Sequence, residues 1–335
     1  MATTRNRFSQ SPIKPRLWLR SLLVLLWCIA SQATAQAGNN EPLLGNFTLG
    51  DLRTSALLFV NSTASPGVDS SQLYVNDGSR LSEIARSSLG YGGDITVRDT
   101  VWDFYWGAAL SVGHIDEDLV IEENLQQYQL IASRDVTSVR GSVGASLMLL
   151  ESLKIRPFFS LYYSDYTAQS VLADGTSVVW PAPGNLGAFH SSEAHALTSA
   201  GSLELDWQHW FNRYQWRLSG QYNLAYTDFY SEKSPHLDTW GWNAIAFAKA
   251  RLSGATPWQT WQRDWRWFAY SNYTNYIDQP KSALGFTRFL ETGLGIELML
   301  NLKPLDWFGF RAIGFKAGYI VGDNVTGFNI GMVMR

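Results

Sequence analysis

The chain has 335 residues, of which 46% are hydrophobic, 14% aromatic and only 16% charged, and its formal net charge is −3. This length suffices for one large domain, and the charge is not basic enough to indicate nucleic-acid binding. The mean hydropathy of −0.12 excludes a bundle of apolar membrane helices. It does not exclude a membrane β-barrel, because every second residue of a barrel strand is polar.

The first 35 residues have the three parts of a secretory signal peptide. Basic residues precede an apolar run at 22–30, and the small-x-small sequence Ala33-Thr34-Ala35 follows it. The run is too short to span about 30 Å of hydrocarbon, so we expect cleavage after Ala35, or after Ala37, rather than a membrane anchor. The only cysteine, Cys28, lies in this segment. Export without disulfides suits a bacterial envelope protein.

The stretch at 36–51 is polar, and we interpret it as a short periplasmic lead before a barrel domain over 52–335. The first strand is predicted at 52–61, followed by a loop at 62–71 and a further strand segment at 73–75. From residue 89 onward apolar and polar residues alternate more clearly, although the stretch at 240–253 is ambiguous because apolar and polar residues share one of its faces. Period-two alternation predicts strands with one apolar and one polar face. These strands are predicted at 89–97, 102–113, 139–149, 155–164, 240–253, 265–276, 286–302, 307–321 and 324–334.

The strongest pattern is a hairpin at 203–226 with its turn at 209–213. Leu203, Leu205 and Trp207 share one face of its first strand, whereas Glu204 and Asp206 share the other. Strands of soluble proteins usually have about 5–6 residues. Two adjacent strands of about ten residues favour a transmembrane β-barrel, with lipid outside and a polar lumen inside. The pattern therefore predicts an all-β, antiparallel up-and-down barrel of about twelve strands, with both ends at the periplasmic side.

Tryptophans recur near the predicted strand ends, for example at Trp102 and Trp207. Indole is amphipathic, so this placement is typical of the aromatic girdles at a membrane interface. A tryptophan-rich soluble β-protein that binds sugars is the alternative.

The export signal, the twelve amphipathic strands and the ending at 326–334 resemble an autotransporter β-barrel. Without a passenger domain, the chain is most similar to the solitary autotransporter-like barrels of the Gram-negative outer membrane. This resemblance implies insertion by the barrel assembly machinery, which reads the apolar face of the last strand. The matching positions are Phe328, Ile330, Met332 and Met334. Arg335 departs from the terminal Phe or Trp that is usual for such strands.

The predicted lumen carries charges of both signs, at Arg156, Glu204, Asp206, Arg217, Glu291 and Glu297. This mixture favours pairing across the lumen over a strongly ion-selective ring. We predict no catalytic residue, no cofactor and no metal site.

Two other stretches could carry chemistry. The predicted outward loop at 114–124 is acidic, and its carboxylates could hold Ca²⁺ or bridge lipopolysaccharide phosphates through divalent ions. Its spacing does not match a calcium loop, which favours a solvated acidic loop. His190-Ser191-Ser192-Glu193 could indicate a serine nucleophile with its base. Adjacent residues on a strand point apart, however, and a catalytic triad depends on spatial geometry.

The function expected from the sequence is that of a non-enzymatic, porin-like outer-membrane barrel with a structural, narrow-pore or transport role. Its expected partners are outer-membrane lipid, lipopolysaccharide and the barrel assembly machinery, and it is expected to be a monomer. The alternative is an outer-membrane protease or lipid hydrolase with its site at the extracellular rim. Twelve strands lie between the filled barrels of eight and the open channels of sixteen. The strand number therefore leaves open whether the lumen is plugged.

Overall fold

The computed structural model describes residues 49–61, 67–78, 80–97, 100–123, 126–172, 175, 191–230, 239–277, 281–300 and 311–335. The chain divides into two compact units, Met1–Glu41 and Pro42–Arg335, and all described residues belong to the second. The predicted signal peptide and residues 36–48 of the predicted lead lie outside the described residues.

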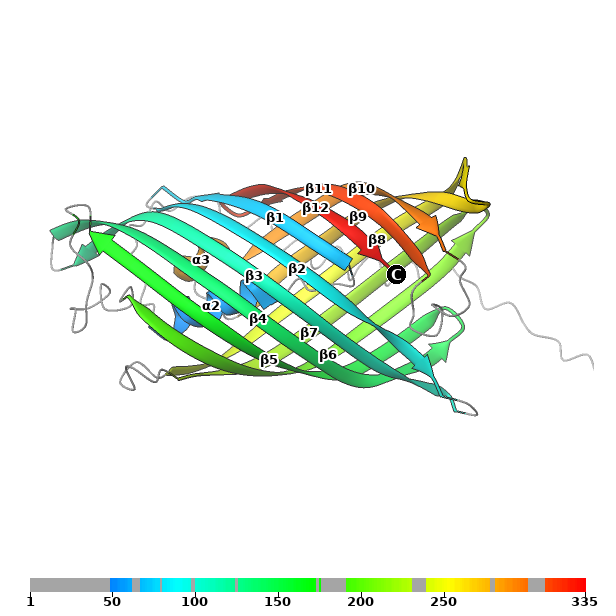
Figure 1. Ribbon diagram of the computed structural model, residues 1–335, viewed down its shortest axis with the longest axis horizontal. Coiled ribbons are helices and arrows are strands. Elements are labelled where there is room, and N and C mark those ends of the chain that lie inside the picture. The colour runs from blue at the N-terminus through cyan, green and yellow to red at the C-terminus, as the bar shows by residue number, and fades with distance from the viewer. Residues whose placement is uncertain are drawn as a thin grey trace, which may run out of the picture. The chain divides into compact units, whose positions relative to one another are not determined.

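In this part of the chain, twelve antiparallel strands form a closed barrel in which β1 pairs with β12 (Figure 1). The predicted all-β barrel of about twelve strands is confirmed. Its strands are β1 (Gly67–Asn76), β2 (Arg80–Thr96), β3 (Trp102–Glu123), β4 (Gln126–Leu150), β5 (Leu153–Leu172), β6 (Ser192–Phe211), β7 (Tyr214–Tyr230), β8 (Thr239–Thr260), β9 (Arg263–Ile277), β10 (Arg288–Met299), β11 (Ala312–Gly322) and β12 (Val325–Met334).

The two ends of the barrel differ. One end carries the two-residue turns at 151–152, 212–213 and 261–262 together with the end of β12, and we call it the lower end. The other end carries the longest connection between strands, at 173–191, and we call it the upper end. Outer-membrane barrels have short periplasmic turns and longer extracellular loops. The lower end therefore corresponds to the periplasmic side and the upper end to the cell surface.

The outward face is apolar along the middle of the barrel. Leu110, Val139, Leu161 and Leu203 are each 46–56% exposed, and they lie on neighbouring strands. Trp216 near the lower end and the pair Trp240 and Trp242 near the upper end are also exposed. These side chains form a surface that is unfavourable in water, flanked by indoles that suit the membrane interface. The barrel therefore has the exterior of a membrane-spanning protein.

The register of β7 gives the first testable prediction. Leu218 alternates with the exposed Trp216 and points outward, whereas Ser219 lines the lumen. Leu218→Arg is expected to lower the free energy of unfolding by about 2–4 kcal/mol if the residue lies at the bilayer midplane. Ser219→Arg is expected to cost far less, because its side chain enters an aqueous cavity. Urea titration in lipid vesicles, followed by heat-modifiable gel mobility, compares the two, and equal losses would refute the register.

β3 and β4 extend well beyond the membrane, since they have 22 and 25 residues and a spanning strand needs about 9–11. The prediction of a loop at 114–124 is therefore wrong, because β3 continues to Glu123 in register with β4. The alternation persists there, but the apolar residues now point into the lumen instead of toward lipid. Ile115, Leu119 and Ile121 point inward and are 0% exposed, whereas Asp116 and Asp118 point outward. Glu117 is the acidic residue of this segment that points inward, where it is paired with arginines.

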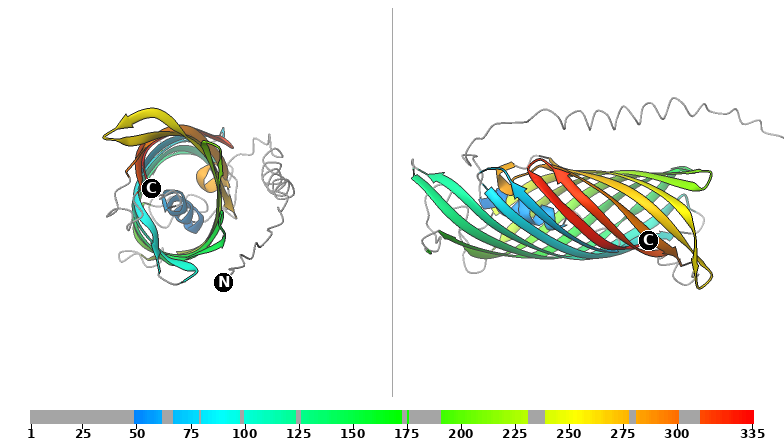
Figure 2. Two further views of the ribbon diagram at one scale, coloured as in Figure 1. Left: turned by 90° about the vertical axis from the view of Figure 1, so that its right-hand side faces the viewer. Right: turned by 90° about the horizontal axis from the view of Figure 1, so that it is seen from above.

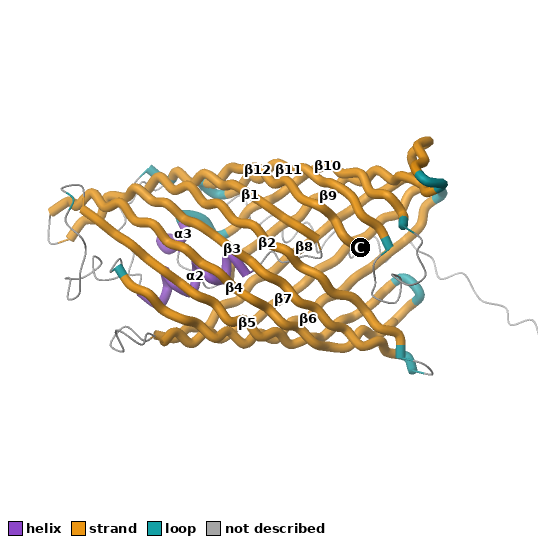
Figure 3. The backbone as a smooth tube through the Cα atoms, viewed as in Figure 1, coloured by secondary structure: helices purple, strands orange, loops and turns teal. Residues whose placement is uncertain are grey.

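The interior explains this inversion, because a helix fills the upper half of the barrel. Residues Leu49–Asn61 form α2, which lies inside the lumen (Figures 2 and 3). The prediction of a first strand at 52–61 is wrong, and β1 begins only at Gly67, within the predicted loop at 62–71. A helix that is enclosed on all sides is buried all round. Accordingly, Leu52, Ala56, Leu57, Phe59 and Val60 are each at most 2% exposed.

The upper half of the lumen is therefore a hydrophobic core. Ile84, Ile115 and Ile245 from the wall belong to one buried cluster with the α2 residues Leu57 and Phe59. The short helix α3 (Lys281–Leu284) also contacts α2. The sequence left the inner face of β8 ambiguous, because apolar and polar residues share it. The structure shows why: the upper part of that face packs on α2 and the lower part lines a polar cavity. No helix among the described residues is long and apolar enough to cross a membrane.

Candidate functional site

The last turn of α2 is held by Arg86 of β2. Its Nη1 donates a hydrogen bond to the carbonyl oxygen of Phe59 at 3.2 Å, and its Nε donates to Ser71 Oγ at 2.8 Å. The guanidinium carbon also lies 4.3 Å from the centroid of the Phe59 ring. Carbonyls in the last turn of a helix lack an intrahelical donor. Arg86 therefore satisfies a helix end that is shielded from water.

The first turns of α2 are held by the helix's own Arg53, which is 0% exposed. Its Nη2 donates to Ser192 Oγ of β6 at 2.8 Å, and its guanidinium carbon lies 5.7 and 5.8 Å from the rings of Tyr166 and Phe229. Such cation–π contacts gain strength when they are desolvated. Between these two attachments the wall is close to the helix, because a Cβ atom at Gly113 would overlap the side chain of Val60.

A buried charge cluster also lies on the inner face of the upper wall. The Glu117 carboxylate is 0% exposed, forms an ion pair with Arg134 and lies 3.6 Å from Arg80 Nε. Ser82 Oγ donates to it at 3.3 Å. Removing one partner of a buried ion pair leaves the other charge buried without compensation, which strongly destabilises the fold. This cluster therefore ties β2, β3 and β4 together around the helix.

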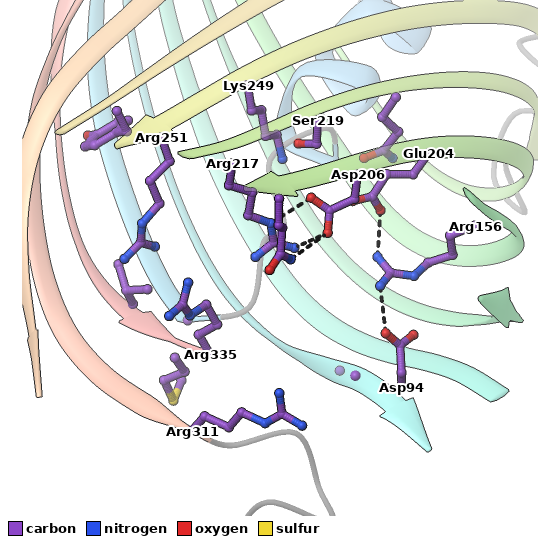
Figure 4. Close-up of a pocket in the computed structure, with 18 of the residues that line it drawn as sticks. Asp94, Arg156, Glu204, Asp206, Arg217, Ser219, Lys249, Arg251, Arg311 and Arg335 are labelled. Carbon is purple, nitrogen blue, oxygen red and sulfur yellow. Dashed lines mark hydrogen bonds and ion pairs between the residues drawn. The ribbon is translucent and has the colours of Figure 1, made fainter. Parts of the chain in front are cut away.

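Below α2 the lumen opens into a polar cavity of about 650 Å³, which we call the lower chamber. Asn61, the last residue of α2, lies at its upper boundary. Arg156 donates from Nη1 to Glu204 at 2.8 Å and from Nη2 to Asp94 at 2.9 Å (Figure 4). On the neighbouring strands β6 and β7, Arg217 donates from Nε and Nη2 to the two oxygens of Asp206, both at 2.8 Å.

The two glutamates of β10 point inward as well. The Glu297 carboxylate is 0% exposed and lies 2.6 Å from Arg251 and 3.4 Å from Arg335. The Glu291 carboxylate accepts a hydrogen bond from Tyr270 Oη at 2.8 Å and lies 3.9 Å from Lys316. All six charges assigned to the lumen from the sequence thus point inward, and each contacts a residue of opposite charge. Sequence reasoning missed four of the partners, which are Asp94, Arg251, Lys316 and Arg335.

Alternation could have revealed some of these partners. Asp94 lies on the polar face of the predicted strand at 89–97, so its inward position follows from the pattern, whereas Arg251 lies on β8, whose faces were ambiguous in the sequence. Arg335 has no strand pattern of its own, because it follows β12. Its backbone nonetheless continues the pairing, since its N–H donates to the carbonyl of Ala312 at 3.0 Å and its carbonyl accepts from the Ala312 N–H at 2.6 Å.

The final strand has the face expected from the sequence on its outer side. Phe328 and Ile330 are 44% and 61% exposed, and Met332 and Met334, which follow on the same side, are half-buried. β12 pairs with β1 from Val75↔Val325 to Gly67↔Val333. The strand therefore closes the barrel.

Among the described residues of the rim, His195 and Ser192 do not form a hydrolase site. His195 points outward, where its Nδ1 lies 2.6 Å from Asp165 and 3.2 Å from Tyr163 Oη. Ser192 points inward and accepts the hydrogen bond from Arg53. His190 lies outside the described residues. Among the described residues, no group of His, Cys, Asp and Glu side chains could hold a metal ion.

Solved structures with this fold include autotransporter translocators. The β-domain of the Bordetella autotransporter BrkA has a TM-score of 0.50 and 12% identity, and the match covers 79% of this chain and 95% of that one. The transport unit of AIDA-I from Escherichia coli has a TM-score of 0.49 and 10% identity, with 87% and 100% covered. The translocator domain of NalP from Neisseria meningitidis has a TM-score of 0.45 and 10% identity, with 84% and 92% covered.

At 12% identity the likeness to the BrkA β-domain shows the fold alone, that of a β-barrel. No protein-family model and no curated protein matches the sequence.

Proposed function

We propose that the protein is an outer-membrane barrel of the translocator type, through whose lumen its own chain passes, and that it is not an enzyme. The observation that carries this proposal is the path of α2. Leu52 in its first turn packs with Leu119 and Ile121 near the upper end, whereas Asn61 borders the lower chamber. β1 then begins at Gly67, which pairs with Val333 near the end of β12. The chain therefore runs down the inside of the barrel before it enters the wall.

A helix suits this path because it satisfies its backbone hydrogen bonds internally. It needs no pairing with the wall and has a diameter of about 10–12 Å with its side chains. The wall accommodates the helix, because Gly113 has no side chain that would overlap Val60 of α2. Arg86 and Arg53 add hydrogen bonds between the helix and the wall. In the resting state α2 closes the upper half of the lumen. The same helix would therefore be the segment that passes through the barrel and the plug that closes it.

The contrary proposal, a rim hydrolase, lacks a site among the described residues, because the histidine of β6 and the nearby serine face opposite sides of the wall. The apolar exterior supports contact with outer-membrane lipid and lipopolysaccharide. The apolar face of β12 supports recognition by the barrel assembly machinery. Every strand edge of the closed barrel is paired, which supports a monomer.

Single cysteines in a Cys28→Ser background test the path of the chain. Asp51→Cys, in the first turn of α2, is expected to react with a membrane-impermeant thiol reagent added to whole cells. Asn61→Cys is expected to react only after the outer membrane is permeabilised, because it faces the lower chamber. Glu151→Cys, in a turn at the lower end, is the periplasmic control. Labelling of Asn61→Cys but not of Asp51→Cys in whole cells would reverse the direction of α2 and overturn the proposal.

A further inference from the structure

We infer that the lower chamber is a binding site for a small multivalent oxyanion. Among the described residues, ten lysines and arginines line it against five aspartates and glutamates. Glu291 and Glu297 also point inward and pair with lining cations without lining the cavity themselves, and with these two included the described cations still exceed the carboxylates by three. The lining cations are Arg140, Lys154, Arg156, Arg217, Lys249, Arg251, Arg266, Arg311, Lys316 and Arg335.

The excess is concentrated on one wall. On β2, β5 and β6, the carboxylates of Asp94, Glu204 and Asp206 are already engaged by Lys154, Arg156 and Arg217. On β8 and β9, in contrast, the cations outnumber the carboxylates. There, the Glu297 carboxylate from β10 is shared by Arg251 and Arg335.

Two cations of this wall form no ion pair with any described residue. Lys249 Nζ lies 5.6 Å from the ring centroid of Phe247. Arg266 donates from Nη2 to Ser253 Oγ at 3.2 Å, and its guanidinium carbon lies 4.9 Å from the ring of Trp210. The Nε of Arg266 is buried without a hydrogen-bond partner. Buried donors of this kind are costly to leave unsatisfied, so this wall presents donors that a ligand oxygen can fill.

The register places like charges next to each other on this wall. Arg217 of β7 lies directly opposite Arg251 of β8, and the next inward pair along these strands is Ser219 and Lys249. Like charges at directly opposed positions destabilise a sheet. Figure 4 shows Arg217 of β7, Lys249 and Arg251 of β8 and Arg335 after β12 around one space. A bound anion in that space would reduce the repulsion further than Asp206 and Glu297 already do through their ion pairs with Arg217 and Arg251.

The chemistry of these donors defines the ligand. Guanidinium groups bind phosphate and carboxylate through paired hydrogen bonds, and an ammonium group adds a compact positive charge. A cavity of about 650 Å³ falls within the size range of small-ligand sites. The ligand is therefore a small molecule with at least two anionic groups, either phosphates or carboxylates, that enters from the periplasmic side. This inference does not depend on the direction of α2.

Calorimetric titration of the full-length protein in detergent tests the site, with pyrophosphate and citrate as separate probes at constant ionic strength. We expect saturable binding of at least one of them. Lys249→Gln combined with Arg266→Gln is expected to weaken it by roughly tenfold or more, since two charge-assisted contacts are lost. Arg213→Gln removes the same charge from the exposed turn of β6 and β7 and is expected to leave binding unchanged.

Ser219→Asp is a second variant that keeps every cation. Its carboxylate would lie across from Lys249 and compete with the ligand, so it is also expected to weaken binding. Binding of pyrophosphate alone identifies a phosphate site, binding of citrate alone a carboxylate site, and both support the inference. The inference is overturned if neither probe binds saturably, or if the folded double variant and Ser219→Asp bind as tightly as the wild type.

Discussion

Deleting residues 328–335 is expected to abolish the folded barrel. This deletion removes the pairs from Gln72↔Phe328 to Gly67↔Val333 on β1, and those from Tyr319↔Phe328 to Ile313↔Met334 on β11. The edges of β1 and β11 would then face lipid, where each unpaired backbone donor or acceptor costs several kcal/mol. The remaining eleven wall strands offer no other closure that keeps their outward faces in lipid.

The measurement is the heat-modifiable fraction of the protein in outer membranes. Deletion of residues 36–45, which precede every described element, is the control and is expected to leave a folded barrel. Removing Arg335 alone is expected to keep the barrel, because pairing with β1 ends at Val333. Wild-type amounts of folded protein from the eight-residue deletion would refute the role of β12 in closure.

The structure changes what we expect of Arg335 itself. The sequence indicates only an extra residue beyond the usual terminal aromatic, so that its removal or Arg335→Phe should be harmless. In the barrel its guanidinium lies 3.4 Å from the buried carboxylate of Glu297, whose other cation is Arg251. The loss of one of two cations beside a buried carboxylate lowers stability. We therefore expect both variants to fold but to unfold at a lower temperature.

The barrel could be predicted from the sequence because the lower and middle parts of its wall separate two solvents. Lipid outside and water inside impose the alternation of Leu203, Glu204, Leu205 and Asp206. In the upper half this contrast inverts, since the outward face is in water and the inward face packs on α2. Ile115 and Leu119 are apolar residues at positions where the pattern of the lower wall requires polar ones, so a loop is predicted where β3 continues.

The helix could not be predicted for a related reason. Residues 52–61 hold too few turns for a distinct helical period, and their burial on all sides comes from the surrounding wall rather than from their own pattern. The chamber was predicted in part, because Arg156, Glu204 and Arg217 lie on well-patterned strands. The excess of cations was missed because an aromatic residue shares the face of each cation, Phe247 with Lys249 on β8 and Phe268 with Arg266 on β9, so neither face has the pattern of a polar lumen.

Removing residues 49–61 is expected to convert a closed barrel into an open pore. In the intact protein α2 and the side chains around it fill the upper half of the lumen, so the conductance in planar bilayers should be small. Without α2, inward residues such as Ile245 no longer contact it, and the lower chamber becomes continuous with the upper end. Stepwise conductance is expected from the deletion variant, provided that heat-modifiable mobility shows it to be folded.

A single substitution separates the loss of the plug from other effects of the deletion. In Gly113→Val the new side chain would overlap Val60 and must displace α2 from the wall, so we expect openings that are more frequent than in the wild type. Gly141→Val, on the lipid-facing side of the neighbouring strand, meets no atom within 4 Å of its Cβ and is the matched control. Planar-bilayer recordings of the folded variants decide the matter. If Gly113→Val conducts no more than Gly141→Val, and the folded deletion variant stays closed, then α2 does not close the lumen.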